Sequence, residues 1–218
     1  MNTLVIGCRT MENELTAAMK KCRSTYDTVW VEASLHNIKK KLNTTLQDII
    51  DTAKGYDRLL FATGFCGNSI SGLKAGQAAL VFPRVDDCTS LLFGSCQKKL
   101  TWINSYFLTE GWLTGEANIW NDYLHAVQKY GEKRALRIFH TMFAHYTQVA
   151  LLDTGCYDLS KSMEKAKTIA DAFALDCRIL PATTAYLEAL LAGPWDPERF
   201  LIIPPGGVIT DALLAKTS

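Results

Sequence analysis

None of the seven cysteines forms a C-x-x-C pair, which excludes the zinc-ribbon and ferredoxin types of metal site. Their odd number argues against a disulfide framework. An excess of charge is also lacking, because 23 basic and 22 acidic side chains leave a formal net charge of +1. Apart from a KKK run at 39–41 the basic residues are scattered, which argues against nucleic acid as a partner. Any metal site must therefore be assembled from cysteines that are far apart in the sequence.

Long apolar runs are absent as well. No stretch approaches the roughly 20 residues that a membrane-spanning helix needs. The sequence begins with MNTLVIG, without a basic region or a cleavage site, so we expect no signal peptide and no membrane segment. We expect a cytoplasmic protein. With 218 residues, 48% of them hydrophobic, the chain can form one large domain or two small lobes.

Short apolar runs alternate with helical patterns, which predicts an α/β fold with mostly parallel sheets and flanking helices. Strands, some with their turns, are expected at 3–8, 29–31, 58–63, 79–83, 148–155, 177–182 and 199–207. Helices are expected at 11–22, 37–53, 69–76, 86–95, 116–145 (one or two), 160–175 and 184–193.

Two stretches of the chain are rich in βαβ patterns, 1–96 and 147–218. An aromatic and helical connecting region, 97–146, separates them. We expect two Rossmann-like lobes around a shared cleft, and one continuous doubly wound sheet is the alternative.

Three apolar runs in the first ninety residues each end in a cysteine. They are TLVIGC, RLLFATGFC and ALVFPRVDDC, which end at Cys8, Cys66 and Cys88. Ligand sites of α/β sheets lie at the carboxyl ends of the strands, so three parallel neighbouring strands would bring these thiols together. Three thiolates around an open position can hold zinc or a [4Fe–4S] cluster. The alternative is that each is an ordinary buried cysteine.

Metal binding is favoured over nucleophilic catalysis because a nucleophilic cysteine needs a base. We expect none of the four histidines in a strand-end turn; they are His36, His125, His140 and His145. Coordination to a metal deprotonates thiols without a base.

Four charged residues are candidates for a catalytic or substrate-binding role. Arg84 could bind a carboxylate or phosphate with its planar fork, or could pair with an aspartate to fix the loop. Asp87 could cap a helix beside Cys88. Glu12 could be explained by the helix dipole alone. Asp153 ends an apolar strand, where an acid needs a partner or a function.

Four turn residues are candidates for lining a cofactor or ligand: Gly67, Asn68, Gly155 and Gly206. Glycines permit a positive φ or a close approach of the backbone to a ligand, but plain tight turns explain them equally well. The TEGW segment, with Trp112, could supply a lid or aromatic wall, or belong to the core.

Several segments in order resemble a known family: IGCRTMENEL, YDRLLFATGFCGNSISGL, ALVFPRVDDCTSLLFGS, FLTEGWL, ALLDTGCYD and LLAGPWDPERFLIIPPGG. The chain is similar over nearly its whole length to the prokaryotic family called domain of unknown function 1638. The resemblance implies cysteines at the positions of Cys8, Cys66 and Cys88 and occurrence in anaerobes, in several cases near corrinoid-dependent methyl-transfer systems. Four cysteines fall outside the family pattern and are expected to be ordinary: Cys22, Cys96, Cys156 and Cys177.

The sequence therefore predicts a metalloprotein with a three-cysteine site that holds zinc or a [4Fe–4S] cluster. It would act on a small anionic molecule, as a metal-dependent lyase or transferase, or serve corrinoid methyl-transfer metabolism with a corrinoid or methyltransferase protein as partner. The alternatives are a cofactor-free cysteine enzyme, racemase-like or hydrolytic, and a module that binds a metal or cofactor without chemistry.

Overall fold

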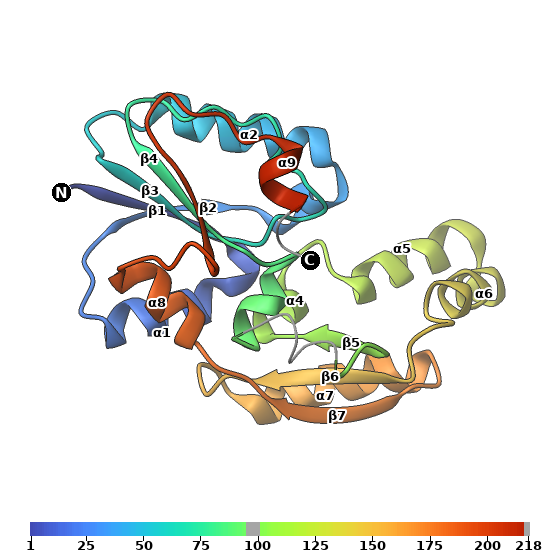
Figure 1. Ribbon diagram of the computed structural model, residues 1–218. Coiled ribbons are helices and arrows are strands. Elements are labelled where there is room, and N and C mark those ends of the chain that lie inside the picture. The colour runs from blue at the N-terminus through green and yellow to red at the C-terminus, as the bar shows by residue number, and fades with distance from the viewer. Residues whose placement is uncertain (95–100, 216–218) are drawn as a thin grey trace.

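The computed structural model describes residues 1–94 and 101–215, whose strands form two separate sheets (Figure 1). The larger sheet has the order β2-β1-β3-β4-β8; its first four strands are parallel and β8 runs antiparallel to β4. Its strands, in chain order, are β1 (Thr3–Cys8), β2 (Asp27–Val31), β3 (Arg58–Ala62), β4 (Ala79–Pro83) and β8 (Phe200–Ile203). The smaller sheet is parallel, and its strands are β5 (Ser105–Leu108), β6 (Gln148–Asp153) and β7 (Asp176–Pro181). The α/β fold with two mostly parallel sheets is confirmed.

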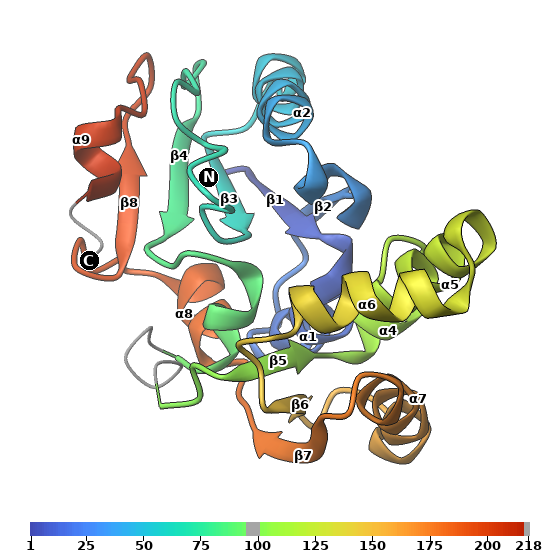
Figure 2. The same cartoon turned by 90° about the vertical axis from the view of Figure 1, so that its right-hand side faces the viewer.

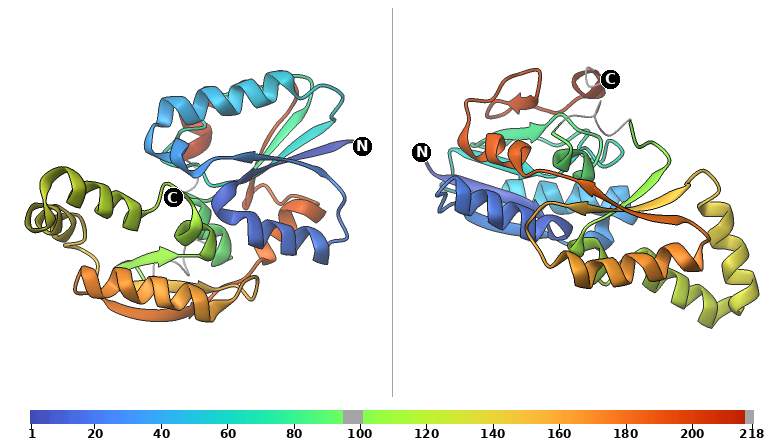
Figure 3. Two further views of the ribbon diagram at one scale, coloured as in Figure 1. Left: turned by 180° about the vertical axis from the view of Figure 1, so that it is seen from behind. Right: turned by 90° about the horizontal axis from the view of Figure 1, so that it is seen from below.

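Helices form layers above, between and below the sheets (Figures 1 and 3). The longer ones are α1 (Glu12–Lys21), α2 (Lys39–Thr52), α5 (Ile119–Tyr130), α6 (Glu132–Met142), α7 (Leu159–Ala172) and α8 (Ala185–Ala192). The short ones are η1 (Arg9–Met11), η2 (Ala33–Asn37), η3 (Cys88–Leu92), α4 (Glu110–Thr114) and α9 (Asp211–Leu214). Figure 1 shows α2 on one side of the larger sheet, α1 and α8 between the two sheets, and α7 beyond the smaller sheet.

One hydrophobic core joins the two sheets. Because successive side chains of a strand point to opposite faces, Val5 of β1 faces α1 and α8, whereas its neighbours Leu4 and Ile6 face α2. The core that includes Val5 also contains Ala150 and Leu152 of β6. The two sheets are therefore held together by shared packing around α1 and α8.

A second and a third core lie on the outer faces. The outer face of the larger sheet is covered by α2, and there the rings of Phe61 and Phe82 stack with centroids 3.9 Å apart. The outer face of the smaller sheet packs against α7 and the α5–α6 pair. Gly131, with φ +78°, lies between α5 and α6, so the helical region 116–145 contains two helices. Figure 2 shows this pair projecting to one side of the sheets.

Three local features differ from the sequence-based prediction. The last of the three strands expected in the second lobe, β8, instead pairs with β4 of the larger sheet. Strand β5 comes from the segment that was expected to connect the two lobes, and it pairs with β6 of the smaller sheet. The predicted helix at 69–76 is wrong; turns and an isolated bridge from Lys74 to Val208 occupy this stretch. All three differences depend on long-range pairing, which a short apolar run does not specify. No helix in the described ranges is long and apolar enough to cross a membrane.

Candidate metal centre

The three strand-end cysteines lie at one edge of the larger sheet. Cys8 is the last residue of β1, Cys66 follows β3 in the next turn, and Cys88 opens η3 after β4. Because β1, β3 and β4 are adjacent and parallel, their carboxyl ends share this edge. Two backbone hydrogen bonds join the two later loops: the amide of Phe65 donates to the carbonyl of Val85 (2.9 Å), and that of Cys66 to Asp86 (2.8 Å).

A histidine completes a compact group of ligand atoms with two of these cysteines. The Nε2 atom of His36 lies 3.8 Å from the Sγ of Cys8 and 4.0 Å from the Sγ of Cys88. All three ligand atoms lie within 4.8 Å of one another, so the group could hold a metal ion. Both cysteines are buried and His36 is partly buried.

The tautomer of His36 suits this role. Its Nδ1 lies 3.1 Å from the carbonyl oxygen of Ala33, and because a carbonyl can only accept, Nδ1–H is the donor. In the neutral ring the lone pair is then on Nε2, which faces the two thiols. A backbone hydrogen bond of this kind fixes the orientation of many metal-binding histidines.

His36 is a candidate ligand that was not predicted from the sequence. We expected no histidine in a strand-end turn, but η2 follows the end of β2 at Val31, and β2 is the neighbour of β1 at the same edge. This expectation was wrong because strand VWV carries no cysteine, and only strands that end in a cysteine were expected to contribute to the site. The signal was present in the sequence: SLHN follows the second predicted strand, VWV, by only a few residues.

Electrostatics keep the thiols of the metal-free site neutral. Hydrogen bonding with Cys88, followed by burial, raises the pKa of Cys8 well above its ordinary value. Hydrogen bonding with Cys66, with a further contribution from burial, does the same for the pKa of Cys88. Burial alone would lower the pKa of His36, but hydrogen bonding with Cys8 and the charge of Asp87 contribute to a net rise. Ligation by a metal would therefore displace protons from both thiols.

Cys66 lies beside this group in a constrained backbone. It has φ +47°, a left-handed conformation that is uncommon for residues other than glycine and that tends to mark functional positions. Gly67 and Asn68 follow with φ +66° and +63°. Together with Cys8 and His36, Cys66 lines an enclosed cavity of about 10 Å³, which is room for a single small atom or water.

Two polar atoms near the group have no hydrogen-bond partner among the described residues. They are the hydroxyl of Thr63, which lines the same small cavity, and the indole N–H of Trp112. The ring of Trp112 meets that of His36 edge-on, with centroids 6.0 Å apart. Trp112 thus forms an aromatic wall beside His36 and also packs against the third core. Unsatisfied buried donors are rare in folded proteins and call for an explanation.

Close backbone approaches fix the loops around the centre. A methyl group on Gly64 would lie 2.6 Å from the amide nitrogen of Asp87, and one on Gly111 would lie 2.6 Å from the carbonyl carbon of Thr10. Gly64 therefore lets the loop after β3 contact the loop after β4, and Gly111 lets α4 contact η1. The Thr10 hydroxyl is 3.0 Å from the Sγ of Cys8.

A larger cavity of about 610 Å³ is lined by residues that lie close in sequence to Cys8 and His36. Its walls include Arg9 and Thr10, which follow Cys8, and Ala33 and Ser34, which precede His36. Segment 114–117 closes the opposite side. The guanidinium of Arg9 is paired with Glu12 and Glu32, each at 3.2 Å.

The four predicted catalytic residues have different surroundings. Asp87 caps η3, accepting from the amide of Ser90 at 2.9 Å. Glu12 is an exposed partner of Arg9. The guanidinium of Arg84 donates to two carbonyls of the C-terminal segment, at 2.8 and 3.2 Å. Asp153 ends β6 in the smaller sheet and accepts from the amide of Gly155. Of the four, Asp87 is brought next to the ligand group.

The remaining candidates divide between the two sheets. Gly67 and Asn68 follow Cys66 directly, whereas Gly155 lies in the turn after β6 and Gly206 in the turn after β8. Among the cysteines expected to be ordinary, Cys22, Cys156 and Cys177 are free and partly buried, and Cys96 lies outside the described residues.

Comparison with known proteins gives one match. The sequence profile of the family described as protein of unknown function (DUF1638) matches residues 30–191. His36, Cys66 and Cys88 lie within this range and Cys8 precedes it. No curated protein and no solved structure matches the chain.

Proposed function

The chain belongs to the DUF1638 family, and from its side-chain geometry we propose that it is a metalloprotein in which Cys8, His36 and Cys88 bind one zinc-type ion. One observation carries the proposal: two thiols and an imidazole nitrogen from three separate elements, β1, η2 and η3, converge within 4.8 Å. For zinc with tetrahedral bonds of about 2.3 Å to sulfur and 2.0–2.1 Å to nitrogen, sulfur and nitrogen ligands are about 3.6 Å apart. The observed 3.8 and 4.0 Å need little contraction.

A single ion fits better than an iron–sulfur cluster. A [4Fe–4S] cluster held by Cys8, Cys66 and Cys88 would place the sulfurs on different irons, with eight inorganic atoms between them. The cavity lined by Cys8, His36 and Cys66 measures about 10 Å³ and accommodates one small atom. Nitrogen from a neutral imidazole together with thiolates is a donor set typical of zinc.

Two cysteines and one histidine leave a fourth position on a tetrahedral ion, as in zinc sites that perform chemistry. The unpartnered hydroxyl of Thr63 and the indole N–H of Trp112 support a polar group bound there. Cys66 is the alternative occupant, because its side chain hydrogen bonds with Cys88. An ion with an exchangeable fourth position would act as a Lewis acid on a bound water, thiol or oxyanion.

Substrate would approach through the 610 Å³ cavity beside Arg9 and Ser34. The proposal also includes a small anionic ligand, which is inferred from the sequence. It includes a corrinoid or methyltransferase protein as partner, which is inferred from the family resemblance. Arg84 lends the anionic ligand little support, because its guanidinium already donates to backbone carbonyls.

A cofactor-free cysteine enzyme is the weaker reading. Such an enzyme needs a thiolate at neutral pH. The pKa of Cys8, hydrogen-bonded to Cys88 and buried, and that of Cys88, hydrogen-bonded to Cys66 and buried, are both raised, which keeps the thiols protonated.

Metal analysis of purified protein tests the proposal. We expect about one zinc per chain in the wild type and in the control Cys177→Ser, whose thiol lies in the smaller sheet. Cys8→Ser, Cys88→Ser and His36→Ala should each retain less than about a tenth of that metal while keeping the wild-type circular dichroism spectrum. Cys66→Ser should retain zinc if a water or substrate occupies the fourth position. Iron with inorganic sulfide in the wild type, or full zinc in the three ligand variants, would refute the proposal.

A further inference from the structure

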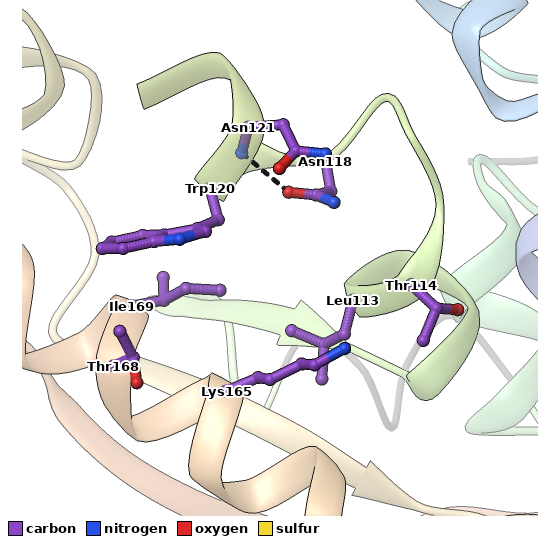
Figure 4. Close-up of a pocket in the computed structure, with 8 residues that line it drawn as sticks. All are labelled: Leu113, Thr114, Asn118, Trp120, Asn121, Lys165, Thr168 and Ile169. Carbon is purple, nitrogen blue, oxygen red and sulfur yellow. Dashed lines mark hydrogen bonds between the residues drawn. The ribbon is translucent and has the colours of Figure 1, made fainter. Parts of the chain in front are cut away.

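A third cavity, of about 420 Å³, is lined by residues of α4, the start of α5 and α7, and none of them belongs to the metal centre. Figure 4 shows Lys165 extending from α7 across it toward Leu113, while the indole ring of Trp120 lies over Ile169. Its volume falls in the range of small-molecule sites.

The walls of this cavity combine an apolar surface with one cation. Leu113 and Ile169 are buried and form the apolar floor, and the ring of Trp120 lies over Ile169 (Figure 4). Lys165 supplies the positive charge. It makes no ion pair among the described residues, whereas Lys161 on the same helix pairs with Asp158 at 3.6 Å. No acidic side chain of the described chain lines the cavity.

The rim of the cavity is preorganised. Asn118 caps α5 by accepting from the amide of Asn121 at 2.9 Å, and the side chain of Asn121 donates to the carbonyl of Glu116 at 2.9 Å. These bonds fix the start of α5 and with it the position of Trp120. The remaining amides of the first turn of this 12-residue helix add partial positive charge.

We propose that this cavity binds a small organic anion with a planar aromatic body. The ring stacks against Trp120 and covers Leu113 and Ile169, and the anionic group pairs with Lys165. This ligand class follows from the presence of both a cation and an apolar surface. An uncharged ring would leave Lys165 without an ionic partner, and an inorganic anion would leave Leu113 and Ile169 uncovered. None of the proposed metal ligands lines this cavity, so the ligand proposal does not depend on the zinc proposal.

The aromatic sulfonate 8-anilinonaphthalene-1-sulfonate provides a direct probe, because it becomes fluorescent in apolar sites and accepts energy from tryptophan. We expect saturable binding of one molecule per chain, with and without zinc. Lys165→Gln should weaken binding by up to about fivefold, the range for losing one solvent-screened charge pair. The control Lys167→Gln, on the same helix but outside the cavity, should bind as the wild type does.

Two further measurements separate the cavity from its charge. Thr168→Trp places a large ring at the mouth of the cavity and should abolish binding without touching the core, since Thr168 is exposed. The uncharged analogue N-phenyl-1-naphthylamine should bind the wild type and Lys165→Gln equally. Wild-type affinity in both Lys165→Gln and Thr168→Trp, or binding of several dye molecules without saturation, would overturn the proposal.

Discussion

Gly64→Ala should damage the metal centre without removing a ligand. The methyl group would lie 2.6 Å from the amide nitrogen of Asp87, whereas ordinary contacts begin near 3.4 Å. Because the Cα and carbonyl carbon of Asp87 lie closer still, the loop that carries Cys66 and the loop that carries Cys88 would have to separate by about 1 Å. Metal sites tolerate about 0.2 Å in ligand distances. The substitution therefore displaces Cys88 from the other two ligands by several times that tolerance.

The magnitude follows from the same geometry. Overpacking of this kind destabilises by about 1–3 kcal/mol. For a chain of this length that lowers Tm by roughly 2–12 °C. Zinc affinity should fall about 10- to 100-fold, the effect of disturbing groups that orient metal ligands. Calorimetry for Tm and competition with a chromophoric chelator for affinity measure the two effects.

Gly76→Ala is the matched control. Its nearest neighbour would be the carbonyl oxygen of Ile50 at 3.8 Å, an ordinary contact, and its backbone is not left-handed. We expect changes in stability within about 0.5 kcal/mol and unchanged zinc affinity. If Gly64→Ala matches this control in both measurements, the close approach of the two loops is not what positions Cys88.

Three other predictions follow from the surroundings of single groups. Arg84→Lys should lose about 1–3 kcal/mol of stability in urea unfolding, because lysine cannot donate to two carbonyls at once, and zinc content should not change. Burial raises the pKa of Glu14 despite hydrogen bonds to its carboxyl from its own backbone amide and from Thr154, so wild-type stability should fall as pH rises from about 4.3 through the raised pKa. Glu14→Gln should lack that component of the pH dependence, and equal slopes for both proteins in urea titrations between pH 4 and 8 would contradict this account. Zinc binding at pH 7 should release about two protons from the two cysteine ligands and any proton that His36 carries because its pKa is raised, seen as a dependence of the calorimetric heat on the buffer.

The sequence predicted that the three cysteines lie at one edge of the larger sheet, because the end of a strand can be recognised from neighbouring residues alone. An apolar run that ends at Cys8, Cys66 or Cys88 indicates both a buried strand and the end of it, and parallel pairing then brings the ends together. The convergence of Cys8 and Cys88 is confirmed by the geometry of the ligand group. Cys66 lies alongside, and its role as a ligand stays a prediction.

The features that the sequence did not predict depend on contacts between distant segments. His36 reaches the thiols because β2 pairs with β1, and nothing local to SLHN specifies that pairing. In the same way FLII of β8 reads as a buried strand, but its partner β4 lies more than a hundred residues away. A short apolar run identifies a strand and leaves the choice of neighbour to the packing of the whole chain.

X-ray absorption at the zinc edge of the purified protein tests the central claim most directly. The account predicts a first shell that contains two sulfur atoms at about 2.3 Å and one imidazole nitrogen at about 2.0–2.1 Å, with a single further oxygen or sulfur ligand. His36→Ala should lose the imidazole contribution in whatever zinc it retains. A shell of oxygen and nitrogen without sulfur, or a wild-type protein that binds no zinc and contains iron–iron scattering, would contradict a zinc centre formed by Cys8, His36 and Cys88.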